Sequence, residues 1–303
     1  MNNAFDSGAL GSDVARSRKQ YFVRRIAAAV VGLLRLNKPG LLTTEIVQAI
    51  NPVATVDTPH GPLLCRAGHG RLLWRARTFH TEEPHTVAWL DRLKPEDVYW
   101  DIGANVGMYA VYAAKFRRCR TLAFEPESQN YALLVDNIVL NGVSERCLPV
   151  SIGVSDTEGT SRLRVRYVTK GGAFNSLGDA EPQSFQAAQS YERHKGFEQL
   201  VYSSSVDALV RRHGLPAPTH IKLDVDGLEP NIVAGAMETI RAGSVRSILV
   251  ELNRKAPADM AIPGILAQQG FRQTLASDTW DQRGDRTRAQ DLPTVNAIFE
   301  RPD

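Results

Sequence analysis

The sequence predicts an α/β fold, in which a mostly parallel sheet carries helices on both faces. Two observations predict it. Short apolar runs alternate with stretches of helical periodicity between residues 98 and 275. The first run, residues 98–100, ends in Asp101 and is followed by a glycine-rich turn and a helix-like stretch at 108–117. A strand, a tight turn and a helix in this order form the unit at which an open α/β sheet binds nucleotide-like ligands.

The remaining elements follow from apolar periodicity and from the residues that begin and end helices. The expected strands are residues 98–100, 121–124, 148–154, 162–168, 200–204, 219–224, 247–253, 270–275 and 294–301. The expected helices are residues 81–93, 108–117, 127–140, 205–212, 229–240 and 256–269. Residues 171–199 are polar and lack periodicity, and a segment of this length inside a compact domain indicates a functional insertion or lid.

The chain is expected to consist of an N-terminal extension, residues 1–80, and a main domain, residues 81–303. Residues 51–80 contain two β-like runs, near 53–56 and 71–75, which predict a small antiparallel piece before the main fold.

Residues 21–36 are basic and amphipathic. Their continuous apolar part, 26–34, lies between Arg25 and Arg35 and is much shorter than the roughly 18 residues that span a bilayer. A signal peptide would begin nearer Met1 and end in a small-residue cleavage site, which is missing here. Two interpretations remain: a helix that packs on the main domain, or a helix in weak peripheral contact with an anionic membrane surface.

Composition restricts the class of protein. A net charge of +3 on 303 residues is too small to indicate a nucleic-acid partner by itself. The three cysteines, Cys65, Cys119 and Cys147, are an odd count without metal-ligand spacing. They predict reduced thiols, and hence a cytoplasmic protein or one peripheral to the inner face of the membrane.

The glycine turn at 103–107 restricts the ligand. Asn105 stands where a dinucleotide fingerprint has its second glycine, and no Lys-Ser/Thr pair follows that would make a phosphate-binding loop. Glu125 ends the second strand, about 20 residues after the turn, where an acid can accept hydrogen bonds from both ribose hydroxyls. An acid before the turn and another after the second strand, without pyrophosphate-binding residues, indicate S-adenosylmethionine as cofactor. The alternative is an α/β sheet with an ordinary glycine turn.

The chain resembles the FkbM-type S-adenosylmethionine-dependent methyltransferases over residues 80–300. The motifs that carry the resemblance are residues 101–107 (Asp-Ile-Gly-Ala-Asn-Val-Gly), 124–126 (Phe-Glu-Pro) with Asn137 and Asn141-Gly142, 221–227 (Ile-Lys-Leu-Asp-Val-Asp-Gly) with Glu229 and Gly235-Ala236, and 250–252 (Val-Glu-Leu). Weaker echoes are Glu83-Pro84, Val206-Asp207 and residues 296–299. Asp226 stands where the family usually has Glu, and residues 1–60 match no part of the pattern.

The resemblance implies a class I, Rossmann-like methyltransferase fold: seven strands, of which the last is antiparallel and inserted near the sheet edge. It also implies O-methylation of a hydroxyl on a sugar, glycolipid, polysaccharide or secondary metabolite. The residues then expected to bind the cofactor are Asp101, Gly103, Asn105, Gly107, Glu125, Ser151 and Ile152. Ser151 and Ile152 would flank the adenine. The alternative role for Glu125 is an acid at a helix N-terminus, where the helix dipole favours it.

Lys222, Asp224 and Asp226 alternate at the end of a predicted strand, so we expect all three to face one side of the cleft. An alcohol acceptor needs a base that takes its proton as the methyl group arrives. Asp224 is the first candidate for this base or for orienting the acceptor, and Asp226 and Glu229 could share the work. Acids after a parallel strand also commonly serve as caps, and no metal is expected. A Mg²⁺ or Ca²⁺ ion held by the three carboxylates is the alternative.

The residues expected to contact the acceptor are Lys222, Glu251, Asn175 and Ser176. His80, His85 and His194 lie in segments expected to cover the cleft, as alternative bases or as surface histidines.

The function expected from these residues is O-methylation of a sugar-containing acceptor, with a polyketide or other secondary metabolite as the alternative acceptor. A NAD-type oxidoreductase is a second reading, and the broken glycine fingerprint argues against it. A non-catalytic cofactor-binding module is a third, and the intact acids Asp101, Glu125 and Asp224 argue against it.

Overall fold

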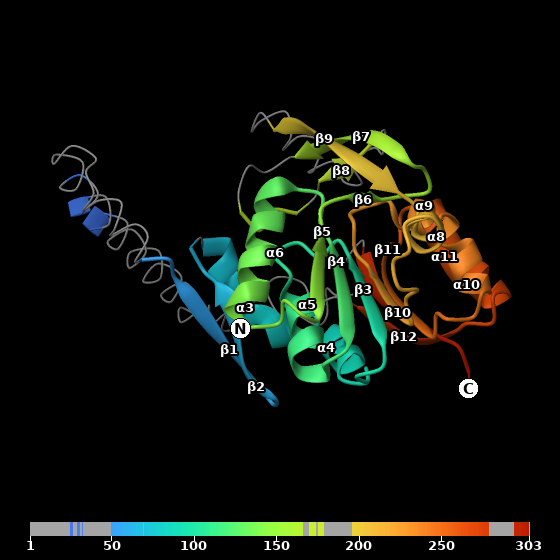
Figure 1. Cartoon of the computed structure of the whole chain (residues 1–303), viewed down its shortest axis with the longest axis horizontal. Helices are drawn as coiled ribbons and strands as arrows, with labels where there is room; N and C mark the ends of the chain where they lie inside the picture. The colour runs from blue at the N-terminus through green and yellow to red at the C-terminus, as the bar shows by residue number, and fades with distance from the viewer. Residues whose placement is uncertain are drawn as a thin grey trace, which may run out of the picture. The chain divides into compact units, whose positions relative to one another are not determined.

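The computed structural model describes residues 25–26, 29–30, 32, 50–68, 70–165, 170–173, 175–178, 196–278 and 294–302 (Figure 1). The chain divides into two compact units, Met1–Asn51 and Pro52–Asp303. In the first unit, residues 25–26, 29–30 and 32 are helical, in agreement with the helix predicted over 21–36, whose other residues lie outside the described part. No helix among the described residues is long and apolar enough to cross a membrane.

The centre of the larger unit, within the described residues, is a seven-stranded sheet with the order β12-β13-β11-β10-β3-β4-β5 (Figure 1). Its strands are β3 (Val98–Ile102), β4 (Arg120–Phe124), β5 (Cys147–Val150), β10 (His220–Leu223), β11 (Ser247–Asn253), β12 (Arg272–Asp278) and β13 (Thr294–Glu300). Strands β5, β4, β3, β10 and β11 pair in parallel, whereas β13 runs antiparallel between β11 and β12. The expected sheet, with its last strand antiparallel and next to the edge, is confirmed.

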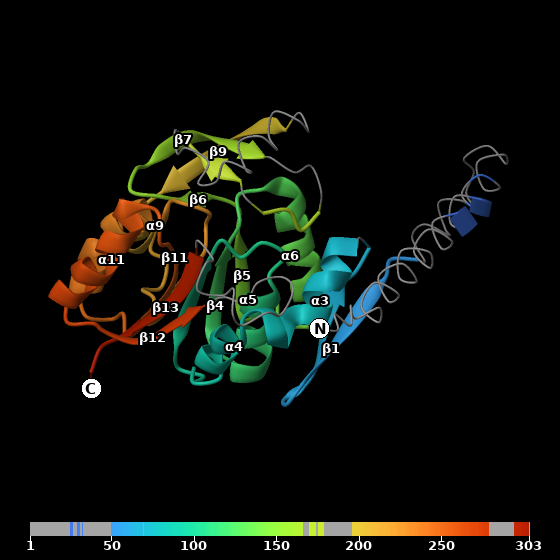
Figure 2. The ribbon, with the colours of Figure 1, turned by 180° about the vertical axis from the view of Figure 1, so that it is seen from behind.

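Each face of the sheet has its own core, because successive side chains of a strand point to opposite faces. Tyr99 packs in one cluster and Trp100 in the other. The elements in the Tyr99 cluster are β1 (Val53–Thr58), β2 (Gly61–Arg66), α3 (Gly70–Glu82), α4 (Pro84–Leu90), α5 (Met108–Tyr112), η1 (Ala113–Arg117) and α6 (Ser128–Leu140). The helices in the Trp100 cluster are α8 (Val206–Arg211), α9 (Glu229–Ala234), α10 (Met237–Arg241) and α11 (Pro257–Gln268). Figure 2 shows the two groups flanking the sheet.

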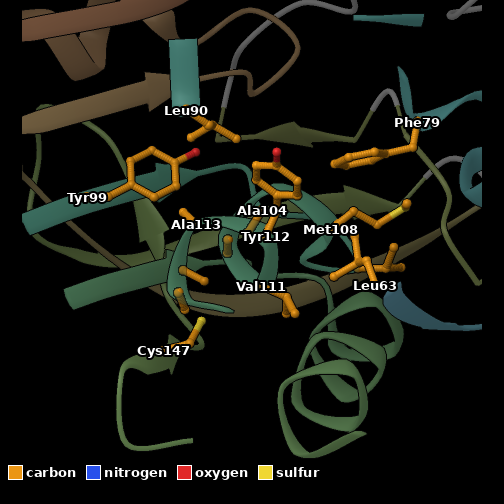
Figure 3. Packing of buried hydrophobic residues seen from close by; sticks show 14 of the residues in the cluster. Leu63, Phe79, Leu90, Tyr99, Ala104, Met108, Val111, Tyr112, Ala113 and Cys147 are labelled. Carbon is orange, nitrogen blue, oxygen red and sulfur yellow. The ribbon is translucent and has the colours of Figure 1, made fainter. Parts of the chain in front are cut away.

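Residues 52–80 belong to the same compact unit as the predicted main domain, although the sequence places a boundary after residue 80. The ring of Phe79 in α3 lies 5.4 Å from that of Tyr109 and 5.5 Å from that of Tyr112. Figure 3 shows Phe79 and Leu63, from the N-terminal part of this unit, beside Met108 of α5. Residues 52–80 are therefore part of the core that supports the glycine turn.

The strand expected near residues 71–75 is wrong, because these residues form the first turns of α3. Leu72, Ala76 and Phe79 recur at helical spacing and are the buried residues of this helix, whereas the short apolar run 72–74 read by itself favours a strand. The small antiparallel piece exists, and its second strand is β2, which pairs with β1. The helix expected at 81–93 is α4, which begins at Pro84 after a one-residue break at Glu83.

The single helix expected at 229–240 is also wrong: α9 ends at Ala234 and α10 begins at Met237. The carbonyl of Gly235 accepts a hydrogen bond of 2.9 Å from the backbone N–H of Asp207. A Cβ at Gly235 would lie 2.5 Å from the carbonyl oxygen of Ser155. The loops around Ser155 and Asp207 therefore approach the backbone at the point where the two helices separate.

A smaller sheet lies beyond the carboxyl ends of the central strands and near α6 (Figure 1). Among the described residues its strands are β6 (Gly153–Val154), β9 (Phe197–Ser204), β7 (Gly159–Val165) and β8 (Ser176–Leu177), in this spatial order. The single strand expected at 148–154 is divided into β5 and β6, which belong to different sheets. Part of the predicted insertion at 171–199 forms β8 and the start of β9, and residues 179–195 lie outside the described part.

Candidate active site

The turn between β3 and α5 requires glycine at two positions, because other parts of the chain approach its backbone closely. Gly103 has φ +86°, and a Cβ there would lie 1.9 Å from the carbonyl oxygen of Asp224. Gly107 has φ +79°, and a Cβ there would lie 2.2 Å from Cδ1 of Leu134 in α6. Asn105 has φ +51°, a left-handed conformation that Asn tolerates better than most residues. The turn can therefore lie against both α6 and the loop after β10.

Glu125 lies at the end of β4 and is almost completely buried. Its carboxylate accepts hydrogen bonds of 2.8 Å from the backbone N–H groups of Asn105 and Glu127. Burial raises the pKa of Glu125 to about 8, although these two hydrogen bonds lower it. The N-terminal cap of α6 is Glu127, which accepts from the N–H groups of Gln129 and Asn130. The helix-capping role considered for Glu125 thus belongs to Glu127, and Glu125 instead fixes the glycine turn.

Two asparagines hold residues 171 and 172 against the turn. The Asn105 side chain donates to the carbonyl of Gly172 over 2.7 Å. Asn130, buried in α6, donates to the same carbonyl over 3.1 Å and accepts from the N–H of Gly171 over 2.9 Å. The backbone after residue 171 is thereby positioned beside the end of β4.

The first cleft is bounded by the turn, the ends of β4 and β10, and residues 172, 173, 175 and 177, and it spans about 590 Å³, part of which is open to solvent. Its lining residues are Ile102, Gly103, Asn105, Phe124, Glu125, Pro126, Ile152, Gly153, Val154, Leu163, Gly172, Ala173, Asn175, Leu177, Asp224, Val225, Asp226 and Leu228. Ile152 and Asn175, which are expected to contact the cofactor and the acceptor, both line it. Ser151 is exposed outside it, and Ser176 is buried in β8 without lining it.

The second cleft adjoins the first and encloses about 480 Å³. Gly103, Asn105 and Asp224 line both clefts. Its other lining residues are Arg75, Phe79, Glu82, Glu83, Asp101, Ala104, Val106, Met108, Tyr109 and Lys222. It therefore lies between the glycine turn, the end of β10 and α3.

Asp101 lines the second cleft with an unsatisfied carboxylate. Asp101 is 1% exposed, and neither carboxylate oxygen has a partner in hydrogen-bond geometry among the described residues, although the Tyr99 hydroxyl is close enough to lower its pKa. Burial raises the pKa of Asp101 to about 6, against the opposing effect of the nearby Lys222 ammonium. A buried carboxylate without a partner is costly, and a cationic ligand group in this cleft would remove the cost.

Lys222 and Asp224 meet in the second cleft. The Lys222 ammonium donates to the Asp224 carboxylate over 2.6 Å and lies 5.3 Å from the centre of the Tyr109 ring. Because β10 ends at Leu223, Asp226 does not continue the alternation, and its φ of +58° turns the chain so that it lines only the first cleft. The expectation that all three side chains face one side is therefore wrong for Asp226.

Glu229 and Glu251 line neither cleft. Glu229 is buried and accepts hydrogen bonds of 2.9 Å from the N–H groups of Val225 and Gly227. Burial raises its pKa to about 8. Glu251, in β11, is half-buried, and burial followed by the carboxylates of Asp224 and Asp226 raises its pKa well above the usual range. Glu229 thus shapes the loop after β10, and Glu251 is a carboxyl group on the neighbouring strand whose charged form is disfavoured.

Of the histidines considered as bases, His80 and His85 border neither cleft. His80 contacts the carbonyl of Asp57 over 3.0 Å, and His85 is exposed. His194 lies outside the described residues. In the part of the chain that the structure describes, no group of three or more His, Cys, Asp or Glu side chains is arranged to hold a metal ion.

Arg75, Phe79, Glu82 and Glu83 line the second cleft but are not expected from the sequence as site residues. The positions 75, 79 and 82 share one face of α3, and this signal is hidden when residues 71–75 are read as a strand. From the sequence, Glu83 is expected only as an acid in the first turn of a helix and as a weak motif echo. In the structure its carboxylate accepts from the Thr86 hydroxyl over 2.8 Å, and burial raises its pKa.

Two curated relatives match the chain. Hexuronic acid methyltransferase AglP of Haloferax volcanii is 25% identical over 183 residues, which cover 60% of this chain and 66% of AglP. 31-O-demethyl-FK506 methyltransferase FkbM of Streptomyces tacrolimicus is 25% identical over 244 residues, which cover 75% of this chain and 92% of that protein.

Solved structures match at lower identity. Methyltransferase FkbM of Methylobacillus flagellatus KT has a TM-score of 0.43 and 14% identity, over 68% of this chain and 44% of that chain. TYW2 of P. horikoshii, in complex with MeSAdo, has a TM-score of 0.43 and 10% identity, over 82% of this chain and 70% of that chain.

The family model described as the methyltransferase FkbM domain matches residues 101–273, which is more than half of the chain. This range begins at the buried acid before the glycine turn and includes the Lys222–Asp224 pair. The resemblance noted from the motifs is therefore confirmed. The chain belongs to the FkbM methyltransferase family.

Proposed function

We propose that the protein is an S-adenosylmethionine-dependent O-methyltransferase that acts on a hydroxyl of a sugar-containing acceptor. The observation that carries the proposal is the pair of clefts that meet at Gly103 and Asp224, one bordered by Glu125 and the other by Asp101. A cofactor with a nucleoside at one end and an amino acid at the other matches two adjoining clefts of different chemistry. The family membership supports methyl transfer as the reaction.

The residues present fit this cofactor. Phe124, Ile152 and Val154 give the first cleft apolar walls for an adenine ring, and Glu125 is placed to accept from ribose hydroxyls. Asp101 offers an unpartnered carboxylate for the ammonium group of the amino-acid end. The absence of a side chain at Gly103 lets the turn lie against the Asp224 carbonyl, and both residues line both clefts.

When bound, S-adenosylmethionine supplies a methyl group activated by attachment to a positively charged sulfur. The chain's contribution is to orient the acceptor hydroxyl and to take its proton. Asp224 lines both clefts, and Lys222 holds its carboxylate, so Asp224 remains the first candidate for this role. Asp226 can contact a ligand from the first cleft, whereas Glu229 acts by holding the loop that carries both aspartates.

A sugar acceptor is supported by the relative named a hexuronic acid methyltransferase, at 25% identity. The relative named a 31-O-demethyl-FK506 methyltransferase, at the same identity, supports the alternative of a secondary-metabolite hydroxyl. Transfer of a deuterated methyl group from S-adenosylmethionine separates these candidates. The acceptors would be a hexuronic acid glycoside, a neutral hexose glycoside and a hydroxylated macrolide, with detection by mass spectrometry. Labelling of a glycoside supports the proposal, and labelling of the macrolide alone favours the alternative.

Peripheral membrane contact through residues 21–36 remains a separate proposal, and it rests on the arginines that flank their apolar part. Flotation of the full chain with anionic vesicles tests it. Binding at low salt that is lost at high salt is expected, and no binding at low salt would contradict it.

A further inference from the structure

Arg75 lines the second cleft from α3 and forms no close ion pair, although its charge lowers the pKa of Glu82 and Glu83 from a greater distance. It is half-buried, on the same helix face as Phe79 and Glu82, which also line the cleft. Its Nε is buried without a hydrogen-bond partner. Within the described part of the chain, the Arg75 guanidinium makes no hydrogen bond or ion pair.

Most other charged side chains of the cleft are engaged. Lys222 is bound to Asp224 over 2.6 Å. Glu82 accepts from the Thr78 hydroxyl over 3.2 Å, and Glu83 from the Thr86 hydroxyl over 2.8 Å. Among the described residues that line this cleft, the charged side chains with neither a hydrogen bond nor an ion pair are Asp101 and Arg75.

We propose that Arg75 binds the carboxylate of the cofactor's amino-acid end, while Asp101 binds its ammonium group. The inference rests on the proposed function and assigns to α3 a cofactor-binding residue. An α-amino acid carries an ammonium and a carboxylate on one carbon, so it can satisfy two unpaired groups of opposite charge in one cleft. The planar guanidinium suits a carboxylate because it can donate two parallel hydrogen bonds.

The position of Arg75 depends on how α3 packs on the main unit. Phe79 anchors the helix on Tyr109 and Tyr112, and Arg75 lies one helical turn before it. Cofactor binding would therefore depend on a segment that precedes the glycine turn in sequence. The other ligand chemistry that could reach Arg75 is the carboxylate of an acidic acceptor, and measurements without acceptor separate the two.

The experiment compares S-adenosylhomocysteine with 5′-methylthioadenosine, which has the same nucleoside and thioether but no amino-acid end. Affinities are measured by calorimetry for the full chain and for Arg75→Gln, Arg75→Lys and Asp101→Asn, without acceptor. Arg77→Gln is the matched control, because Arg77 is exposed on the same helix and lines neither cleft.

Arg75→Gln is expected to weaken S-adenosylhomocysteine binding by roughly 10- to 100-fold, the range for losing hydrogen bonds to a charged group. Binding of 5′-methylthioadenosine should stay within about twofold, because that ligand lacks the carboxylate. Asp101→Asn should also weaken S-adenosylhomocysteine binding and spare 5′-methylthioadenosine binding. The S-adenosylhomocysteine affinity of Arg75→Lys should lie between those of Arg75→Gln and the parent chain. Arg77→Gln should change neither affinity.

Unchanged S-adenosylhomocysteine binding in Arg75→Gln would overturn the inference. So would an equal loss for both ligands, which would indicate that Arg75 supports the fold of the site rather than the amino-acid end. These outcomes differ from a failure of the proposed function, in which the parent chain binds neither ligand.

Discussion

The Lys222 ammonium donates a hydrogen bond of 2.6 Å to the Asp224 carboxylate, immediately after the end of β10. Lys222 is 2% exposed and lies within β10, so the sheet fixes the position of this side chain. Burial by itself lowers the pKa of Lys222, but the carboxylates of Asp224, Glu83 and Asp101 outweigh it and raise the pKa above the usual value. This pair places a charged, oriented carboxylate where the two clefts meet.

We predict that Asp224→Asn lowers turnover by about 10²–10⁴, the usual range for losing general-base assistance. S-adenosylhomocysteine affinity should change little, because in the proposed binding mode Asp101 and Glu125 hold the two ends of the cofactor. The substitution also removes the charge of the group that pairs directly with the buried Lys222 ammonium, which destabilises the fold. Turnover, affinity and melting temperature are therefore measured together.

The double variant Lys222→Met/Asp224→Asn separates the two effects. It removes both charges, so stability should recover relative to Asp224→Asn while turnover stays low. Recovery of turnover in the double variant would show that Asp224 matters only for stability. If EDTA abolishes activity and Mg²⁺ restores it, these carboxylates act as metal ligands instead.

Glu125→Ala is expected to weaken binding of both S-adenosylhomocysteine and 5′-methylthioadenosine by roughly 1–3 kcal/mol, the cost of leaving polar groups unpaired. Both ligands carry the ribose, so Glu125 should not distinguish them. Glu127→Gln is the comparison, since Glu127 caps α6 and should affect the melting temperature more than the affinity. If the parent chain and Glu125→Ala bind these ligands with equal affinity, Glu125 only holds the turn and does not bind the ribose.

Gly103→Ala should destabilise the fold by about 2–5 kcal/mol, from left-handed strain and overpacking together. The added Cβ would lie 1.9 Å from the Asp224 carbonyl, so the turn or the loop after β10 must shift. Gly142→Ala is the matched control, because its φ is +65° and nothing lies within 4 Å of its Cβ. Chemical denaturation should show a clearly larger loss of unfolding free energy for Gly103→Ala than for Gly142→Ala. Similar losses would mean that left-handed strain, and not the contact with Asp224, accounts for the destabilisation.

His220 should make the fold less stable as pH falls. Its Nδ1 lies 2.6 Å from the Ser247 hydroxyl, which also accepts from the Trp89 indole N–H, so the Ser247 hydroxyl proton is free to donate to a neutral imidazole. The Asp97 carboxylate beside Nε2 also pairs with Arg246, which compensates its charge. Burial, followed by Arg92, lowers the pKa of His220 from 6.5 to about 4.

Between these two pKa values the unfolded chain binds the proton and the folded chain does not. The contribution of His220 is therefore present above pH 6.5 and is lost as pH falls toward 4, by roughly 3 kcal/mol in total. Buried carboxylates with raised pKa act with the opposite sign, so the informative quantity is the difference between the parent chain and His220→Gln. That difference should vary with pH over this window, whereas His85→Gln should follow the parent chain, and a pH-independent difference contradicts the assignment.

Local patterns predict most of the central sheet, because its strands are short apolar runs bounded by turn residues. They also predict the residue types of the glycine turn and the acid at the end of β4. The close approach of Asp224 to Gly103 is not visible in the sequence, since it joins positions on two separate strands. For the same reason the sequence does not distinguish Asp226, which lines the first cleft, from Glu229, which holds the loop.

The side of the second cleft formed by α3 is the part that sequence reasoning misses, whereas Asp101, Lys222 and Asp224 are expected as site residues. Arg75 and Phe79 belong to the segment that the sequence assigns to the extension, and the first residues of α3 fit a strand as well as a helix when taken alone. Packing of Phe79 on Tyr109 and Tyr112 brings this helix to the glycine turn. Tertiary contact, rather than local propensity, therefore decides which polar residues complete the site.

The central claim is that the two joined clefts bind S-adenosylmethionine, and the most direct test is calorimetry of the full chain with S-adenosylhomocysteine and with NAD. We predict saturable binding of S-adenosylhomocysteine and none of NAD. Binding of NAD without binding of S-adenosylhomocysteine would contradict the account.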